Sequence, residues 1–134
     1  MCVATFSSFK DIHAWQKARS LSREIFRLTI AGSFARDFAL RDQINRSSGS
    51  IMDNIAEGFE RSSKLEFINF LTYSKGSNGE LISQLYRAHD RAHISDEQFN
   101  ALISEAEDIG RMLNGLIGYL NQTRIRGFKF KNRV

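Results

Sequence analysis

The sequence predicts an all-α fold, an antiparallel up-down-up-down four-helix bundle with a short basic C-terminal tail. Three observations indicate this fold. Apolar residues recur at steps of three and four along four successive segments, the connections between these segments are short, and the 134 residues include no proline. Proline breaks a helix from within, so its absence suits long uninterrupted helices. We expect the bundle to form one domain over residues 1–123 and the tail to occupy residues 124–134.

The first helix is expected over residues 9–31, where apolar residues have the spacing of one helical stripe. Ser8 or Asp11 can cap its start. Gly32 suits its end, because glycine readily adopts the left-handed conformation that terminates many helices. The stripe consists of Ile12, Trp15, Ala18, Leu21, Ile25 and Leu28.

The second and third helices, expected over residues 36–60 and 64–92, share an unusual feature. Each carries small, polar residues in its middle, including Gly49 in the second helix and Gly76 and Gly79 in the third. A glycine inside a helix costs about 1 kcal/mol relative to alanine. We therefore expect the two backbones to approach closely at these glycines, with a floor for a small ligand as the alternative.

The fourth helix is expected over residues 95–122. Ser95 begins it, and Glu97 and Gln98 are candidates to complete a capping box. Because the connections between all four segments are short, helices that follow one another along the chain should pack antiparallel.

The basic charge of the chain is concentrated in the tail. Of the 19 Lys and Arg residues, five lie in residues 124–133, which contain no acid, and the remaining 14 face 15 Asp and Glu residues, so that the bundle has a net charge near −1. In the tail, cations that can neutralise phosphates alternate with aromatic rings that can stack on bases. The tail is thus our candidate nucleic-acid-binding segment. The alternatives are a solvated terminus, or an extension whose Phe128 and Phe130 pack on a neighbouring subunit. The candidate cations are Arg124, Arg126, Lys129, Lys131 and Arg133.

Other features of the composition point to a cytoplasmic protein without a membrane segment. The only cysteine is Cys2, which can form neither an internal disulfide nor a cysteine-based zinc site. The first residues lack the basic and apolar regions of a secretory signal. No stretch approaches the roughly 20 apolar residues that cross a bilayer.

A set of polar residues on the second and third helices predicts a polar network between them. Asn54, Glu57 and Arg61 are three and four residues apart and share a helix face. A buried carboxylate without a partner is costly, so each glutamate of the set should find a hydrogen-bond donor. We expect this network to set the register of the two helices, and a subunit contact or a binding site are the alternatives. The full set is Arg46, Asn54, Glu57, Arg61, Ser77 and Glu80.

Catalytic and metal sites are not favoured. His89 and His93 are four residues apart, a spacing that places two side chains on one helix face and resembles a zinc-protease pattern with aspartate in place of glutamate. However, Arg87 and Arg91 would repel a metal ion there. A ferritin-like site needs Glu-x-x-His pairs, and the sequence contains none. We expect no catalytic residues, no metal and no cofactor.

The motifs of the second and third helices resemble a known family, the four-helix-bundle proteins encoded within intervening sequences of bacterial 23S ribosomal RNA genes. Residues 54–58, Asn-Ile-Ala-Glu-Gly, are the most specific part of the resemblance. It extends over residues 9 to about 120. The supporting segments are residues 9–11, 15–18, 43–51, 67–71, 76–81 and 112–117.

The resemblance implies an up-down-up-down bundle that assembles as a ring, typically of five subunits. A related group comprises the accessory proteins of diversity-generating retroelements, which contact a reverse transcriptase and nucleic acid. This sequence departs from the family pattern at two places. Met52-Asp53 stands where the family often has a proline, and Ser47-Ser48-Gly49 stands where it favours alanines.

We expect a non-enzymatic homo-oligomer, a homopentamer by resemblance, that binds RNA or DNA, or a nucleoprotein partner, through basic surface and the tail. The first alternative is a protein–protein adaptor without nucleic-acid contact. A third hypothesis is a metal-dependent enzyme that uses His89, His93 and either Glu57 or Glu80.

Overall fold

The computed structural model describes residues 6–123, and this part of the chain contains helices and turns but no strand. The all-α prediction is therefore confirmed. Short 3-10 helices precede the first and the second α-helix. The elements are η1 (Phe9–Asp11), α1 (His13–Thr29), η2 (Gly32–Arg36), α2 (Phe38–Glu60), α3 (Lys64–Asp90) and α4 (Asp96–Gln122).

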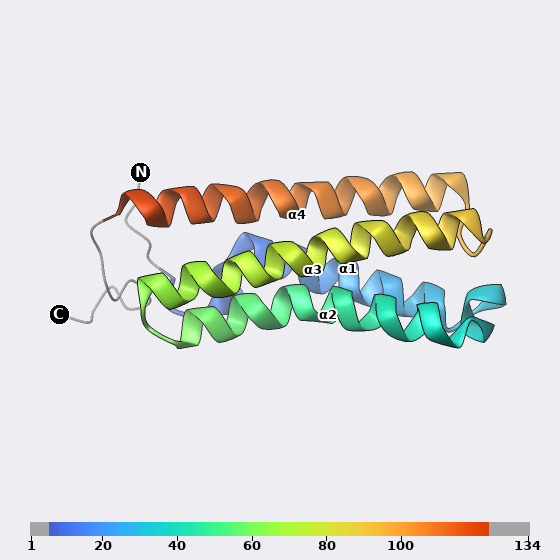
Figure 1. Cartoon of the computed structure of the whole chain (residues 1–134), viewed down its shortest axis with the longest axis horizontal. Helices are drawn as coiled ribbons and strands as arrows, with labels where there is room; N and C mark the ends of the chain where they lie inside the picture. The colour runs from blue at the N-terminus through green and yellow to red at the C-terminus, as the bar shows by residue number, and fades with distance from the viewer. Residues whose placement is uncertain (1–5, 124–134) are drawn as a thin grey trace.

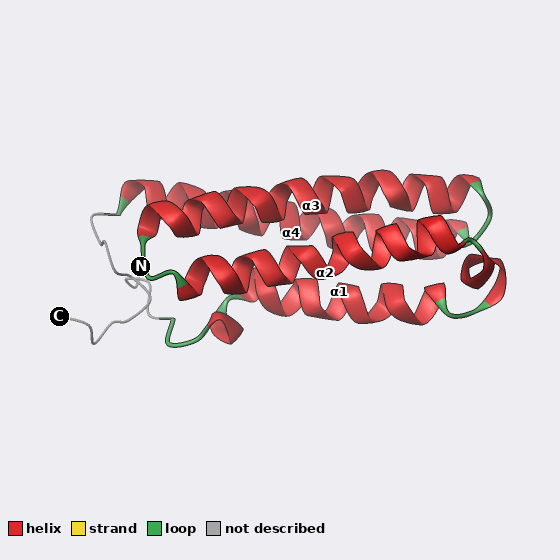
Figure 2. Ribbon diagram, turned by 60° about the horizontal axis from the view of Figure 1, so that its bottom comes forward, coloured by secondary structure: helices red, strands yellow, loops and turns green. Residues whose placement is uncertain are grey.

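The four α-helices form a bundle in which each helix runs antiparallel to the one before it (Figure 1). Helix α1 packs against α2 and α4, and α3 packs against the same two helices. The start of α1 and the end of α4 consequently lie at the same end of the bundle (Figures 1 and 2). The α1–α2 and α3–α4 connections meet at the opposite end.

The first helix begins later than expected. Ser8 does form a capping box with Asp11, but this box caps the separate turn η1. Ile12 then adopts an extended conformation, with φ −80° and ψ 121°, and α1 begins at His13. Gly32 has a φ of 63°, the left-handed conformation predicted for it, and starts η2 directly after α1 has ended.

Side-chain caps start the other three helices. Asp37 caps α2 and Ser63 caps α3, each by accepting a backbone N–H three residues ahead. The predicted capping box of α4 is confirmed between Ser95 and Gln98. These caps satisfy N–H groups that the helical hydrogen-bond pattern leaves free.

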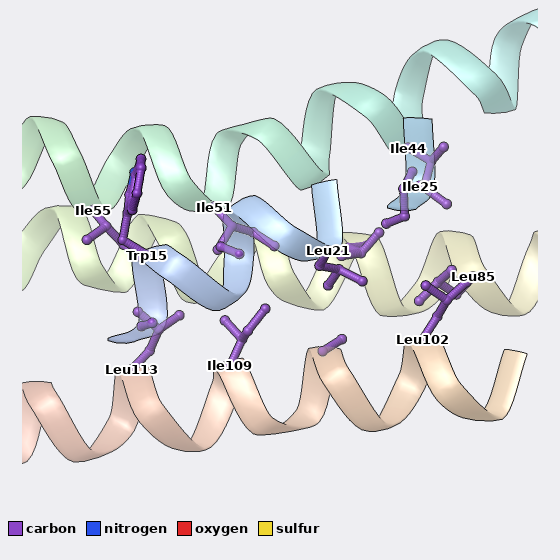
Figure 3. Close-up of a cluster of buried hydrophobic side chains, with 14 of the residues drawn as sticks. Trp15, Leu21, Ile25, Ile44, Ile51, Ile55, Leu85, Leu102, Ile109 and Leu113 are labelled. Atoms are coloured by element: carbon purple, nitrogen blue, oxygen red, sulfur yellow. The ribbon is translucent and has the colours of Figure 1, made fainter. Parts of the chain in front are cut away.

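The apolar stripes of the four helices meet in one continuous core (Figure 3). Two buried polar side chains of α3 form hydrogen bonds to neighbouring helices within this core. Ser74 Oγ donates a hydrogen bond to Ile51 O at 2.7 Å, and Asn78 Nδ2 donates to Ala106 O at 2.9 Å. Because a buried polar group is costly without its partner, these two bonds favour one register of α3 against α2 and α4.

The close approach expected at Gly49, Gly76 and Gly79 is wrong. A Cβ atom at any of the three would meet no atom of another helix within 4 Å. The tight contact lies at Gly58 instead, where a Cβ would stand 2.5 Å from Cβ of Phe70. Gly58 is therefore the residue that lets α2 approach α3, and the other three glycines need another explanation.

Candidate functional surfaces

The predicted polar network lies on the outer surface of α2 and α3, not in the interior. Glu57 and Arg61 form an exposed ion pair at 2.8 Å, and Arg61 also reaches Glu66 at 3.4 Å. The hydrogen bond to Glu57 raises the pKa of the Arg61 guanidinium. Exposed pairs of this kind stabilise a fold only weakly, so this part of the network does little to fix the register of the helices.

The middle of the network joins the two helices. Asn54 Nδ2 donates to Ser50 Oγ at 2.9 Å, and Ser50 Oγ lies 2.8 Å from Ser77 Oγ on α3. All three side chains are half-buried. The chain of hydrogen bonds runs from Asn54 of α2 through Ser50 to Ser77 of α3.

The remaining two members, Arg46 and Glu80, are exposed. They line a hollow of about 250 Å³ on the α2–α3 face. Neither forms an ion pair or a side-chain hydrogen bond within residues 6–123. The expectation that Glu80 requires a donor is therefore wrong, because its carboxylate is solvated. The other residues that line the hollow are Gln43, Ser47, Ser50 and Gln84.

The two histidines do not share a helix face. Helix α3 ends at Asp90, and Ala92, with φ 60°, turns the chain before His93. His89 Nε2 lies 2.6 Å from Asp96 Oδ1, whereas His93 contacts Asp37 across the bundle end. No group of three His, Cys, Asp or Glu side chains within residues 6–123 is arranged to hold a metal ion.

His93 is the centre of a hydrogen-bonded chain that sequence reasoning missed. Its Nε2 lies 2.9 Å from Asp37 Oδ2 and its Nδ1 lies 2.8 Å from Ser33 Oγ, while its ring stacks on Phe34. Arg91 donates to the same Asp37 oxygen at 2.8 Å. The hydrogen bonds from His93 and Arg91 lower the pKa of Asp37 to about 2, so that its carboxylate stays charged.

Charge is segregated between the helices, although the bundle as a whole is nearly neutral. Helix α1 contains four basic residues and one acid, Glu24, which gives it a net charge of +3. Helix α4 contains five acids and one basic residue, Arg111, which gives it −4. The acids of α4 are Asp96, Glu97, Glu105, Glu107 and Asp108.

Three of the cations of α1 form a row on its outer face. Arg19, Arg23 and Arg27 follow one another at intervals of four residues, and all three are exposed. Arg27 pairs with Glu24 at 3.2 Å, and the Arg19 guanidinium lies 5.8 Å from the centre of the Trp15 ring. Within the described part of the chain, Arg19 and Arg23 form no ion pair. The four-residue spacing of these arginines predicts such a row. A net charge summed over the whole bundle does not indicate it, because the acids of α4 offset the cations of α1.

The five tail cations, Arg124 to Arg133, lie outside the described residues. The four described helices also include none with both the length and the apolar composition needed to span a membrane.

Comparisons with known proteins agree with this architecture. A family model described as "23S rRNA-intervening sequence protein" matches residues 10–115, well over half of the chain. One similar solved structure is that of a protein of unknown function from the S23 ribosomal protein family of Bacteroides thetaiotaomicron. It is 24% identical, the match covers 81% of this chain and 98% of that chain, and the TM-score is 0.73. At this identity the likeness concerns the fold alone. A search of the curated proteins gives no match.

Proposed function

The chain belongs to the family of 23S rRNA-intervening sequence proteins, and from this premise we propose that it is a non-enzymatic, homo-oligomeric scaffold that binds RNA through phosphate contacts. The proposed contacts come from the outer face of α1 and from the basic tail. Sequence-independent binding to the phosphate backbone needs exposed cations rather than a pocket or a catalytic constellation.

The arginine row of α1, Arg19, Arg23 and Arg27, is the observation that carries this proposal. Successive members lie about 6 Å apart along the helix axis, because each residue advances an α-helix by about 1.5 Å. Adjacent phosphates of a nucleic-acid strand are separated by a similar distance. Arginine also donates several hydrogen bonds from one rigid plane, which suits phosphate oxygens. Arg19 and Arg23 are available for such contacts, since neither has an acidic partner within residues 6–123.

Self-association would multiply these contacts. If several copies present their arginine rows together, the second and later contacts become intramolecular and the avidity rises without any new kind of interaction. The family resemblance suggests a ring of five, and the five cations of each tail would supply further phosphate contacts.

The outer face of α3 is our proposed contact between copies. Tyr73 and Tyr86, which lie toward opposite edges of this face, are 56% and 52% exposed. Between them, Gly76 and Gly79 are exposed and have open space above their backbones. Their helix-propensity cost has no compensation inside the bundle, whereas a second copy could pack closely against this smooth surface. Exposed tyrosines are typical of protein interfaces.

A filter-binding titration of single-stranded RNA against salt concentration tests the proposal. The affinity should be measurable at low salt, and its logarithm should fall linearly with the logarithm of the salt concentration. An intact, folded chain that binds no RNA at low salt would show that the proposal is wrong.

The acidic helix α4 favours a second candidate function, a protein–protein adaptor that binds a basic partner. Glu97 and Glu105, together with Glu24 of α1, line a hollow of about 400 Å³ in the α1–α4 seam. Such an adaptor would retain its protein partner after nuclease treatment. An RNA scaffold would lose the partners that it holds through RNA.

A further inference from the structure

Three large apolar side chains are exposed where α1 passes into α2, at the end of the bundle that carries this connection (Figure 1). Phe26 is 55% exposed, Ile30 is 59% exposed and Phe38 is 63% exposed. Phe26 lies in the last turn of α1, Ile30 directly follows that helix, and Phe38 is the first residue of α2. Exposed apolar side chains that gather at one place indicate a surface that meets a partner.

On α1, the exposed apolar residues continue the stripe of the two unpaired arginines. Arg19, Arg23, Phe26 and Ile30 follow one another at intervals of four, three and four residues. At about 100° per residue, these four side chains lie within about 60° of one another around the helix axis. Arg19 and Arg23 have no acidic partner within residues 6–123. The stripe therefore passes directly from available cations to exposed apolar side chains.

Helix α2 places Phe38 on the same side of the bundle as Phe26. Asn45 Nδ2 donates to Thr29 Oγ1 at 2.9 Å, which identifies the face of α2 that meets α1. Phe38 lies seven residues before Asn45, so nearly two helical turns bring it back to this face. On α1, Phe26 lies about 60° around the axis from the buried Thr29 and is exposed. The two rings therefore flank the seam between α1 and α2.

The backbone of α2 is uncovered beside Phe26. Gly49 follows Asn45 by four residues, about 6 Å along α2, and Phe26 precedes Thr29 by three residues, about 5 Å along α1. Because the two helices are antiparallel, both steps lead the same way, and Gly49 lies at nearly the height of Phe26. A Cβ atom at Gly49 would meet no atom of another helix within 4 Å. A flat ring can therefore approach Phe26 without meeting a side chain at this position.

The ring of Phe38 is steadied by its neighbours. The Arg41 guanidinium lies 4.8 Å from the centre of the ring. Arg41 is itself held in place, because its Nη1 donates to Ala35 O at 3.0 Å and its Nε donates to Asp42 Oδ1 at 3.3 Å. A ring that is already ordered loses less entropy when a flat partner stacks on it.

Cations and exposed aromatic rings along one seam are complementary to an unpaired nucleic-acid strand. The cations neutralise phosphates, and the rings stack on bases whose faces are uncovered. In a duplex the bases are stacked on one another, so their faces are not accessible in this way. A purely apolar partner would leave Arg19 and Arg23 without a counter-charge. The seam therefore favours a ligand that brings negative charge and flat rings together.

We propose that the α1–α2 seam binds single-stranded RNA, with Arg19 and Arg23 on its phosphates and Phe26 and Phe38 stacked on its unpaired bases. This inference rests on the proposed function and deepens it. Phosphate contacts alone do not distinguish one RNA from another, whereas the two rings select RNA with accessible bases. Every base has a flat face, so this selection does not depend on the base sequence.

Filter binding with two matched RNA strands tests the inference in the full-length chain. One strand is intact, and the other has the same length and the same phosphates but lacks its bases at the central positions. At equal salt, the unchanged protein should bind the intact strand at least about tenfold more tightly, because two stacked bases contribute to its affinity.

Two variants connect this preference to the rings. Phe26→Leu, Phe38→Leu removes both rings and keeps apolar side chains, so it should bind the two RNA strands alike. Its salt dependence should stay that of the unchanged protein, since the arginines are retained. Phe26→Tyr, Phe38→Tyr keeps both rings and should keep the preference. Circular dichroism and sedimentation equilibrium should give both variants the helix content and the mass of the unchanged protein.

The outcomes separate this inference from the proposed function. If the unchanged protein binds both RNA strands equally well, with the expected salt dependence, the stacking is overturned and the proposed function stands. If it binds neither strand at low salt, both are wrong. A preference for the intact strand that survives in the leucine variant would overturn the inference, because the stacking would then lie elsewhere. A lower mass of that variant would overturn it as well, by identifying the rings as a contact between copies.

Discussion

Nε2 of His93 lies 2.9 Å from Oδ2 of Asp37, which joins the α3–α4 connection to the start of α2. Arg91 donates to the same oxygen at 2.8 Å, and Asp37 also caps α2 through Leu40 N. The Asp37 carboxylate therefore links the α1–α2 connection to the α3–α4 connection by hydrogen bonds. Its side chain is 20% exposed and that of His93 is 8% exposed, so the contact is largely shielded from solvent.

Asp37→Asn should lower the free energy of unfolding by about 1 to 2 kcal/mol at neutral pH, because asparagine keeps the helix cap but loses the charge-assisted bonds. The pKa of Asp37 is lowered to about 2 from 3.8. A carboxyl group with a lowered folded-state pKa stabilises the fold fully above its unfolded pKa and loses this effect as the pH falls. The difference between the two proteins should thus shrink as the pH falls from about 4 through about 2.

Urea unfolding of both proteins at neutral and acid pH measures this difference. Asp90→Asn is the matched control, since Asp90 is exposed and has no ion pair or side-chain hydrogen bond within residues 6–123. If the two variants unfold alike at neutral pH, the bonds of Asp37 contribute nothing measurable.

Gly58→Ala should destabilise the protein although alanine is the better helix former. The added Cβ would stand 2.5 Å from Cβ of Phe70 and 3.1 Å from Cδ1 of Phe67, and overpacking of this kind costs about 1–3 kcal/mol. Gly49→Ala in the same helix meets open space and should gain up to about 1 kcal/mol. Thermal or urea unfolding measures the change in the free energy of unfolding for each variant. If both variants were more stable than the unchanged protein, or both less stable, the packing described at Gly58 would be contradicted.

Gly76→Trp should dissociate the proposed oligomer without unfolding the chain. The new side chain points into open space in a single copy but would block close packing of a second copy on α3. Sedimentation equilibrium should give a lower mass for this variant at the same helix content by circular dichroism. Gly115→Trp, at an exposed glycine of α4 with equally open surroundings, should keep the mass of the unchanged protein. Identical masses for all three proteins would remove α3 as the contact.

The helices could be predicted from the sequence because apolar spacing and caps are local signals. Ser95 and Gln98 form the capping box that their spacing indicates, and α2 and α3 end within two residues of their predicted ends. The predicted start of the first helix at residue 9 is wrong, since α1 begins at His13. The capping box of Ser8 and Asp11 suits a 3-10 turn as well as an α-helix. A short motif does not reveal how far the helix continues beyond its first turn.

The candidate sites were harder to predict, because helical spacing gives the face of a residue but not what that face meets. Glu57 and Glu80 share faces with polar neighbours as predicted, yet those faces lie at the surface. The four-residue spacing of His89 and His93 is meaningless once the helix ends between them. The contact of Asp37 with His93 joins residues 56 positions apart, and no local pattern indicates it.

The salt dependence of RNA binding by an Arg19→Gln, Arg23→Gln variant is the most direct test of the proposed function. Each phosphate contact on a single strand contributes about 0.7 to the slope of log affinity against log salt, so losing both should reduce the slope by about 1.4. An Arg46→Gln, Arg111→Gln protein removes the same charge from other exposed positions and should keep a slope near that of the unchanged chain. Equal slopes and affinities in all three proteins would contradict an RNA-binding face on α1.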